Sequence, residues 1–368
     1  MQLIQDLFAN ALSFTWQEGV MLLIGGLLIY LAIRRGMEPA LLLPMGFGAI
    51  LVNLPHVNTG GIEALFNAGI ANELFPLLLF IGVGAMIDFG PLLSSPKMFL
   101  FGAAAQAGIF ITLALALAIG FPLVDAASVA IIGAADGPTS IYVANYFGSQ
   151  YQGAIMVAAY SYMALVPIIQ PPIIRAITTK KERMIRMEYA PSAVSKTTRI
   201  LFPIFVTVIA GTVAPKSAEL IGFLMFGNLI RECGVLDSLS QSAQHELANL
   251  ITLLLGLSVS FKMKAEWFVT WQTLLILGLG LVGFVFDTVG GVLFAKVLNL
   301  VSRKKVNPMI GAAGISAFPM ASRVVHKMGR EEDSGNFLLM HAAGANVSGQ
   351  IASVIAGGLI ITLVENVL

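Results

Sequence analysis

Long apolar segments separated by short polar stretches make up most of the chain. They fall into two sets of six, at roughly 19–33, 39–54, 70–87, 97–120, 127–146 and 153–175, then 199–214, 217–230, 247–261, 270–298, 306–322 and 336–364. A helix needs roughly 20 predominantly apolar residues to cross a bilayer. Because a helix satisfies its own backbone groups in lipid, the pattern predicts an all-α polytopic membrane protein.

The second set of segments repeats features of the first in the same order. The run Ile-Gly-Ala-Ala occurs at 132–135 and again at 310–313, and a proline follows soon after each copy. Two shorter matches keep a similar order and spacing: 47–48 with 226–227, and 79–82 with 253–256. A duplicated unit explains three ordered matches better than chance does. We therefore predict a first repeat at 1–177, a linker at 178–198 and a second repeat at 199–368.

Basic residues set the predicted orientation of the chain. The positive-inside rule assigns the linker 178–198 and the Arg34–Arg35 pair to the cytoplasm, because both are rich in lysine or arginine. Segment 127–146 must then begin and end outside, as a re-entrant hairpin. Each half has about five crossings and one hairpin, at 127–146 and 306–322, so the second half is inverted and both termini lie outside. Three lysines on the predicted outer side do not fit this rule: Lys216, Lys262 and Lys264.

Composition supports the membrane assignment and excludes some partners. The chain is 57% hydrophobic and only 11% charged, against about 25% charged in soluble domains, and its mean hydropathy is +0.86. The net charge of +1 excludes nucleic acid as a partner. The single cysteine, Cys233, cannot form an internal disulfide and has no metal-ligand neighbours in the sequence.

One carboxylate stands out in the apolar segment 127–146. Asp136 is followed at once by Gly137 and Pro138, which interrupt a regular helix, and then by Thr139 and Ser140. Such an acid costs roughly 2.5–3.5 kcal/mol at the bilayer centre, so it is usually functional. Its neighbouring hydroxyls and freed carbonyls predict a small-cation site. The alternative is a structural aspartate that caps the half-helix beginning at Pro138, and capping is also compatible with the ion-binding role.

The second hairpin offers a partner for this acid. Gly314 stands where the first hairpin has Asp136, and Ser316 follows two residues later. If the two hairpin tips meet, Asp136 and Ser316 face one cation. Alternatively, the Ser316 hydroxyl bonds back to its own helix backbone.

Most other polar residues in apolar segments have two interpretations each. Tyr160 is expected to pack between helices, and Tyr162 either does the same or relays protons. Asn346 is either a cation ligand or a polar contact between helices. Asp287 is either an ion relay or a buried residue bonded to a neighbour. Arg323 either holds an anionic substrate group by bidentate bonding or sets the topology of the second hairpin.

The motifs as a group resemble a known family. The run Gly-Ala-Ala-Asp-Gly-Pro-Thr at 133–139, with Asn307-Pro308, Gly311, Ser316 and Arg323, resembles the beta subunit of the biotin-dependent sodium-translocating decarboxylases. These include the oxaloacetate, methylmalonyl-CoA and glutaconyl-CoA decarboxylases. The resemblance implies a subunit that decarboxylates carboxybiotin, exports sodium and takes up a proton from outside. Its implied site residues are Asp136, Tyr162 and Arg323 for catalysis, Arg323 for carboxybiotin, and Asp136, Asn307, Gly311, Ser316 and Asn346 for sodium.

The resemblance also implies partners. These are an alpha subunit with the biotin carrier and carboxyltransferase, a small single-span gamma or delta-type subunit, and two further copies of the chain in a homotrimer. It further implies a lipid-embedded position in a bacterial or archaeal cytoplasmic membrane, with elevator-like movement of the hairpins against a scaffold. Biotin itself must arrive on another chain, because the only similar run, Lys262-Met263-Lys264, lacks the Met-Lys-Met order of a carrier turn. The alternative function is a sodium-coupled carboxylate transporter with no decarboxylase chemistry.

Overall fold

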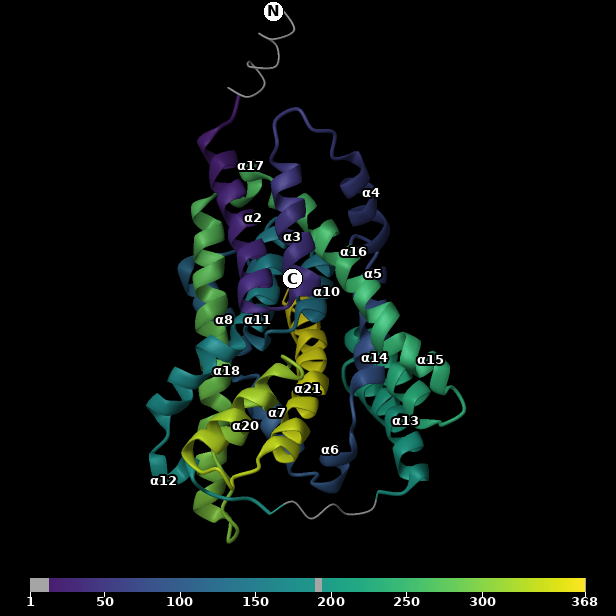
Figure 1. Ribbon diagram of the computed structural model, residues 1–368, viewed down its shortest axis with the longest axis vertical. Helices are drawn as coiled ribbons and strands as arrows, with labels where there is room; N and C mark the ends of the chain where they lie inside the picture. Colours follow the sequence, from purple (N-terminus) through teal and green to yellow (C-terminus); the bar gives the residue numbers. More distant parts are fainter. Residues whose placement is uncertain (1–12, 189–193, 368) are drawn as a thin grey trace, which may run out of the picture.

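The computed structural model describes residues 13–188 and 194–367, which fold into helices joined by loops, with no β-strand among them (Figure 1). The predicted all-α class is therefore confirmed. The helices of the first half are α2 (Trp16–Arg35), α3 (Pro39–Val52), α4 (Gly60–Gly69), α5 (Leu74–Met86), α6 (Gly90–Ser94), α7 (Met98–Ala104), α8 (Ala107–Ile119), α9 (Leu123–Ala130), η1 (Ile131–Ala134), α10 (Gly137–Tyr146) and α11 (Gln152–Ile177).

The linker carries one short helix, α12 (Lys180–Arg183), and part of it, 189–193, lies outside the described residues. The second half consists of α13 (Lys196–Val213), η2 (Pro215–Ser217), α14 (Ala218–Glu232), α15 (Asp237–Ser242), η3 (Ala243–Leu247), α16 (Ala248–Val259), η4 (Ser260–Met263), α17 (Ala265–Phe268), α18 (Trp271–Val301), α19 (Met309–Ala312), α20 (Met320–Glu332) and α21 (Leu339–Glu365). The start of α2 and the helix α12 lie at opposite ends of the molecule (Figure 1).

The described chain contains seven helices that are long and apolar enough to cross a membrane: Trp16–Arg35, Met98–Ile119, Gln152–Ile177, Lys196–Val213, Asp237–Met263, Trp271–Val301 and Leu339–Glu365. An eighth span results if α4 and α5, which meet at an angle of 62°, are counted together. The protein is thus a multi-pass membrane protein.

The sequence predicts ten crossings, but helix length and apolar composition support seven or eight. Two of the expected spans are missing because they form helices that are too short to count. The helices α3 and α14 have 14 and 15 residues. A helix of this size is about 22 Å long, whereas the hydrocarbon core of a bilayer is about 30 Å thick.

Equivalent helices of the two halves pack in exchanged pairs. The helix α2 packs on α3, and α13 packs on α14. Across the halves, α3 packs on α16 and α5 on α14, while α11 packs on α18 and α21 on α7. Reciprocal pairing of this kind fits a two-fold relation between repeats, but the inverted repeat and its boundaries at 177 and 199 stay predictions.

Both segments predicted as hairpins contain a helix break. In the first, α9 and η1 lead to a break at Ala135 and Asp136, after which α10 begins. In the second, the short α19 is followed by an irregular stretch at 313–319 and then by α20. This last helix continues to Glu332, beyond the expected end at 322, because its later turns are amphipathic and bury Val325 and Met328.

The apolar side chains form two clusters. The larger surrounds the hairpins and includes Phe101, Ile132 and Phe284, and the smaller includes Met21 and Leu41 from α2 and α3, with side chains from α16 and α17. The helices α3, α5 and α16 face the hairpin tips, α11 and α21 across a cavity of about 210 Å³. The break in each hairpin therefore borders this cavity, through Asp136 in the first hairpin and Ser316 in the second.

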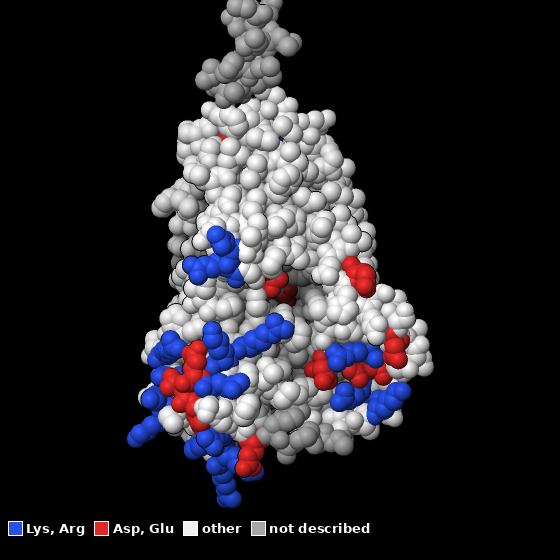
Figure 2. Space-filling model, viewed as in Figure 1, with Lys and Arg blue, Asp and Glu red and all other residues white. Residues whose placement is uncertain are grey.

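Charged side chains cluster away from the apolar centre of the molecule. On the face shown in Figure 2 they gather over the lower part, where α12 and α20 lie on one side and α13 to α15 on the other. The linker is bound there through Arg183, whose Nε lies 2.6 Å from Glu332, and Arg186, whose Nε lies 2.6 Å from Asp333.

The three lysines that did not fit the charge rule each have a partner. Lys216 is 2.9 Å from the carboxylate of Glu365. Lys262 and Lys264 both lie over the rings of Phe261 and Trp267. Their charges are therefore held by local contacts, and the side of the membrane on which they lie stays a prediction.

Candidate ion-binding site

The first hairpin breaks where the sequence predicts. Ala135 adopts a left-handed backbone with φ of 51°, which ends the 3-10 turn η1. Asp136 is the N-cap of α10, and Pro138 occupies the first turn, where its missing N–H costs nothing. The side chain of Asp136 accepts a hydrogen bond from the Thr139 backbone N–H at 3.2 Å. The capping interpretation of Asp136 is thus correct.

The same carboxylate also reaches another helix. Its Oδ2 accepts hydrogen bonds from the Thr139 hydroxyl at 2.8 Å and from the Ser353 hydroxyl of α21 at 2.7 Å. Asp136 is only 3% exposed, so its carboxylate is hydrogen-bonded by hydroxyl groups of the protein and hardly by solvent water. Sequence reasoning did not single out Ser353, because a serine in an apolar helix carries no local sign of its partner.

The two hairpin tips meet at this acid. Ser316 donates its backbone N–H and its hydroxyl to the Ala134 carbonyl, at 3.3 and 2.8 Å. The Ser316 side chain also interacts with the Asp136 carboxylate. The structure therefore brings Asp136 and Ser316 together, and the hydroxyl bonds across to the other hairpin and not to its own helix.

Helix α21 fixes the second tip through its amide side chains. Asn346 donates its amide N–H to the Ile315 carbonyl at 2.7 Å, and Gln350 donates to the Ser316 carbonyl. Within the described part of the chain, the Asn346 Oδ1 is buried and has no hydrogen-bond partner. A carboxamide oxygen without a partner suits a small hard cation, but Asn346 does not line the Asp136 cavity, so its role as a sodium ligand stays a prediction.

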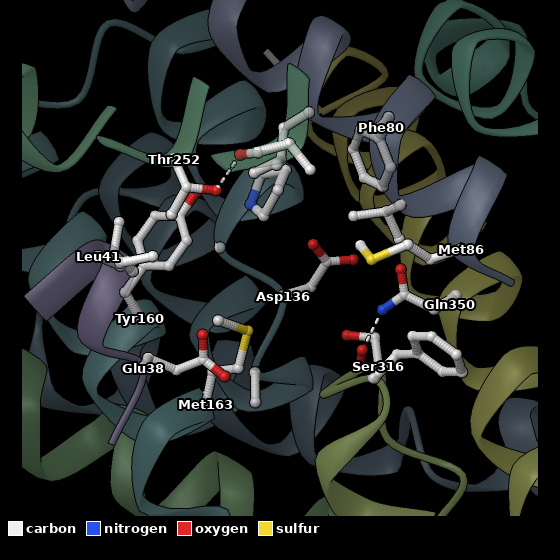
Figure 3. Close-up of a pocket in the computed structure, with 18 of the residues that line it drawn as sticks. Glu38, Leu41, Phe80, Met86, Asp136, Tyr160, Met163, Thr252, Ser316 and Gln350 are labelled. Carbon is white, nitrogen blue, oxygen red and sulfur yellow. Dashed lines mark hydrogen bonds between the residues drawn. The ribbon is translucent and has the colours of Figure 1, made fainter. Parts of the chain in front are cut away.

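The cavity opens directly onto this cluster. Asp136 lies between Tyr160 on one side and Ser316 and Gln350 on the other (Figure 3). The Tyr160 ring packs against Gly137, where a Cβ would overlap it, and its buried hydroxyl has no partner among the described residues. The site thus combines one acid, several neutral oxygens and room for water.

Known proteins of similar sequence identify the family. A family model described as the Na⁺-transporting oxaloacetate decarboxylase beta subunit matches residues 17–364. The chain is 48% identical to the glutaconyl-CoA decarboxylase subunit beta of Acidaminococcus fermentans, over 98% of this chain and 96% of that one. It is 48% identical to the methylmalonyl-CoA decarboxylase subunit beta of Veillonella parvula, over 96% and 95% of the two chains.

A third relative is named for a different acid, oxaloacetate. The probable oxaloacetate decarboxylase beta chain of Vibrio cholerae is 43% identical over 95% of this chain and 96% of that one. The chain belongs to the family of decarboxylase beta subunits. The resemblance described from the motifs is confirmed.

Two residues expected at the sodium site of this beta subunit lie elsewhere. Asn307 donates to the Arg183 and Ile185 carbonyls at 2.8 and 2.9 Å, and its oxygen accepts the Met309 N–H. Gly311 lets α19 cross closely over Gly291 of α18, where a Cβ would overlap the backbone. Neither lines the Asp136 cavity, so the geometry assigns them to linker attachment and helix packing, and a role in sodium binding stays a prediction.

The two tyrosines of α11 point to different neighbours. Tyr162, the expected relay, donates its hydroxyl to the Leu277 carbonyl of α18. Tyr160 lines the cavity with Asp136 instead. Because the two residues are two positions apart on a helix, they cannot share a face. A proton-relay role of Tyr162 stays a prediction.

One further charged residue lines the cavity, and a second acts on it from α20. Arg323 is exposed on α20 and acts electrostatically on Glu38, the N-cap residue of α3, which lines the cavity. Burial raises the pKa of Glu38, and the positive charge of Arg323 opposes that rise. Figure 2 shows acidic and basic side chains beside a hollow near the middle of the face.

One oxygen of Asp287 has a structural explanation. Its Oδ1 accepts the Gly108 backbone N–H near the start of α8, at the break between α7 and α8. A carboxylate at the N-terminus of a helix is stabilised by the unpaired N–H groups there. This contact explains Oδ1, whereas Oδ2 is buried without a hydrogen-bond partner among the described residues, so both interpretations of Asp287 stay predictions.

Proposed function

We propose that this beta subunit removes carbon dioxide from carboxybiotin carried by a partner subunit and couples that step to sodium export across the membrane. Family membership over residues 17–364 is the observation that carries the proposal. The alternative, a carboxylate transporter without decarboxylase chemistry, is not favoured, because full-length relatives at 48% identity are named as decarboxylase subunits. The donor acid belongs to the partner subunits, since relatives named for three different acids match the same chain.

The sodium ion would bind between the hairpin tips. Asp136 supplies the negative charge, and Ser316 and the unpaired Asn346 oxygen supply neutral ligands. A proton from outside would later take the place of sodium on Asp136. The support for this assignment is that the acid and the cavity lie where the Ser316 hydroxyl of one hairpin bonds to the Ala134 carbonyl of the other.

Coupling would come from movement of the hairpins relative to α3, α5 and α16. Carboxybiotin would dock at the cytoplasmic margin near Arg323, and loss of carbon dioxide would favour the outward-facing state. Two inverted repeats and an elevator-like motion fit the exchanged helix pairs and the cavity between the two apolar clusters. Tyr162 would act on proton transfer only through other groups, because its hydroxyl is already bonded to Leu277.

The proposed assembly follows the family. The chain would form a homotrimer with an alpha subunit that carries biotin and a small single-span subunit, in a bacterial or archaeal cytoplasmic membrane. Both termini would lie outside and the basic linker inside. The position of α12 and the linker at the end of the molecule opposite the start of α2 supports this orientation (Figure 1).

The test replaces the central acid by its neutral isostere. Asp136→Asn keeps an N-cap side chain for α10, because asparagine caps as well as aspartate, and removes only the charge. We expect sodium-dependent carbon dioxide release from a carboxylated biotin carrier to fall about 100-fold. A hydrogen-bonded charge contributes about 1.5–3 kcal/mol, and 1.4 kcal/mol is tenfold. The measurement uses the assembled complex in liposomes and follows carbon dioxide and ²²Na⁺ together.

The control is Asp237→Asn, which neutralises an exposed acid at the start of α15. It should leave both rates unchanged. Carboxylate uptake by the wild-type complex without carbon dioxide release would support the transporter instead. If the Asp136→Asn variant kept full sodium-dependent turnover, Asp136 would not be a ligand of the transported ion.

A further inference from the structure

Glu38 has an unusual backbone for its residue type. It lies between α2 and α3 with φ of 36° and ψ of 59°, in the left-handed region, and its side chain makes no capping hydrogen bond. A side chain in this conformation costs roughly 1–2 kcal/mol relative to glycine. Strain of this kind persists where the surrounding structure holds it, and it is concentrated at functional sites. The position would suit glycine, yet it carries an acid.

The Glu38 side chain faces the same space as Asp136. Both line the cavity of about 210 Å³ between α3, α5 and α16 and the hairpin tips, and they are the two acids among its described lining residues. In Figure 3 the Glu38 carboxylate lies on the Tyr160 side of the cavity, and Asp136 lies between Tyr160 and Ser316. A chain of cavity water between the two acids has space in this volume.

Arg323 is the basic group that acts on Glu38 from the facing helix α20. No ion pair within 4.0 Å joins the two described side chains, so Arg323 remains available to an anionic substrate group. Glu38, just before α3, thus lines the cavity, and an arginine of α20 lies close enough to act on its charge.

We infer that Glu38 is the catalytic acid that protonates the biotin nitrogen as carbon dioxide leaves. This inference rests on the proposed function. In the step, the bond between the ureido nitrogen of biotin and the carboxyl carbon breaks, and its electron pair stays on the nitrogen. The proton of the Glu38 carboxyl group moves to that nitrogen. The products are biotin, carbon dioxide and the Glu38 carboxylate, so atoms and charge balance.

The charges around Glu38 favour its protonated form while carboxybiotin is bound. Burial raises the pKa of Glu38, and Arg323 alone opposes that effect. A substrate carboxylate bound to Arg323 would neutralise its charge, so Glu38 would hold its proton more firmly while carboxybiotin is bound. After proton transfer, the new Glu38 carboxylate would attract Arg323 and help to displace the product. Asp136 and Tyr160 are the titratable groups that line the path by which Glu38 would be reprotonated.

The test uses the assembled complex in liposomes and the carboxylated biotin carrier as the probe. Glu38→Gln should lower single-turnover carbon dioxide release about 100-fold or more, as expected for loss of a general acid. Glu38→Gly should show the same loss, because glycine relieves the left-handed backbone and keeps the fold while it removes the acid. Glu63→Gln, on the exposed face of α4, is the matched control and should release carbon dioxide at the wild-type rate.

A pH profile separates chemistry from structure. The wild-type rate should fall as pH rises through the pKa of Glu38, since the protonated form is the donor, and the Gln variant should lack that limb. Wild-type rates in either Glu38→Gln or Glu38→Gly would overturn the role of Glu38. A wild-type complex that releases no carbon dioxide from the carrier would instead overturn the proposed function.

Discussion

Asp136 shows how a charge is tolerated deep in an apolar protein. Its carboxylate accepts three hydrogen bonds, from the N–H and hydroxyl of Thr139 and from the hydroxyl of Ser353. It also lies at the N-terminus of α10, where the helix dipole favours a negative charge. These contacts offset a burial cost of roughly 2.5–3.5 kcal/mol. Capping and ion binding are therefore compatible roles of one side chain.

Ser353 provides a prediction for a residue that only the fold identifies. In Ser353→Ala the carboxylate loses a donor at 2.7 Å, which destabilises its ionised form. We expect the apparent affinity for sodium to weaken about tenfold, because a hydrogen bond to a charged group contributes about 1.5–3 kcal/mol. The measurement is the sodium dependence of carbon dioxide release. Ser348→Ala on the same helix, whose hydroxyl bonds to Met98, should leave it unchanged.

At the scale of elements, close backbone contact holds the second hairpin in place. Gly349 of α21 lies against the Gly314 and Ile315 carbonyls, and Gly314 lies against Phe101 of α7. Small residues at such crossings let helix backbones approach, as is common in membrane bundles. The hairpin tip is therefore fixed between two helices, and its carbonyls are presented to Asn346 and Gln350.

Gly349→Ala tests this packing. A Cβ there would overlap the backbone of the hairpin, so the helix and the hairpin must separate. Overpacking of this kind typically costs 1–3 kcal/mol. We expect a thermal midpoint several degrees lower in detergent solution, and weaker sodium dependence. Gly278→Ala on α18, which has open space around it, should be neutral or slightly stabilising, and an equal loss there would contradict the packing explanation.

At the scale of the whole molecule, charged side chains are concentrated toward one end of the bundle on the face shown in Figure 2. The linker is attached to α20 by ion pairs of Arg183 and Arg186 with Glu332 and Asp333, at one end of the bundle. The hydrogen bond from Arg186 lowers the pKa of Asp333. This ion pair therefore stabilises the attachment of the linker at pH values above the ordinary pKa of an aspartate, and the stabilisation is lost as pH falls through the lowered pKa. The opposite end carries few charges on the face shown in Figure 2.

The predicted orientation has a direct test by cysteine labelling. In a Cys233→Ala background, Lys181→Cys lies in the linker helix and Glu63→Cys on the exposed face of α4. A membrane-impermeant maleimide should label Glu63→Cys on intact cells and Lys181→Cys only after permeabilisation, because the basic linker faces the cytoplasm. The reverse pattern would mean that the chain is inserted the other way round.

The sequence alone determined the helical class, the break at Asp136 and the family, because apolar runs, Gly-Pro interruptions and local motifs act over a few residues. The tertiary structure decided which side chains share the site. Ser353, Gln350 and Tyr160 come to Asp136, whereas Tyr162 and Asn307 bond elsewhere, and the strained Glu38 joins the same cavity. These partners are up to 217 positions apart in the chain, so packing between helices selects them and no local pattern records it.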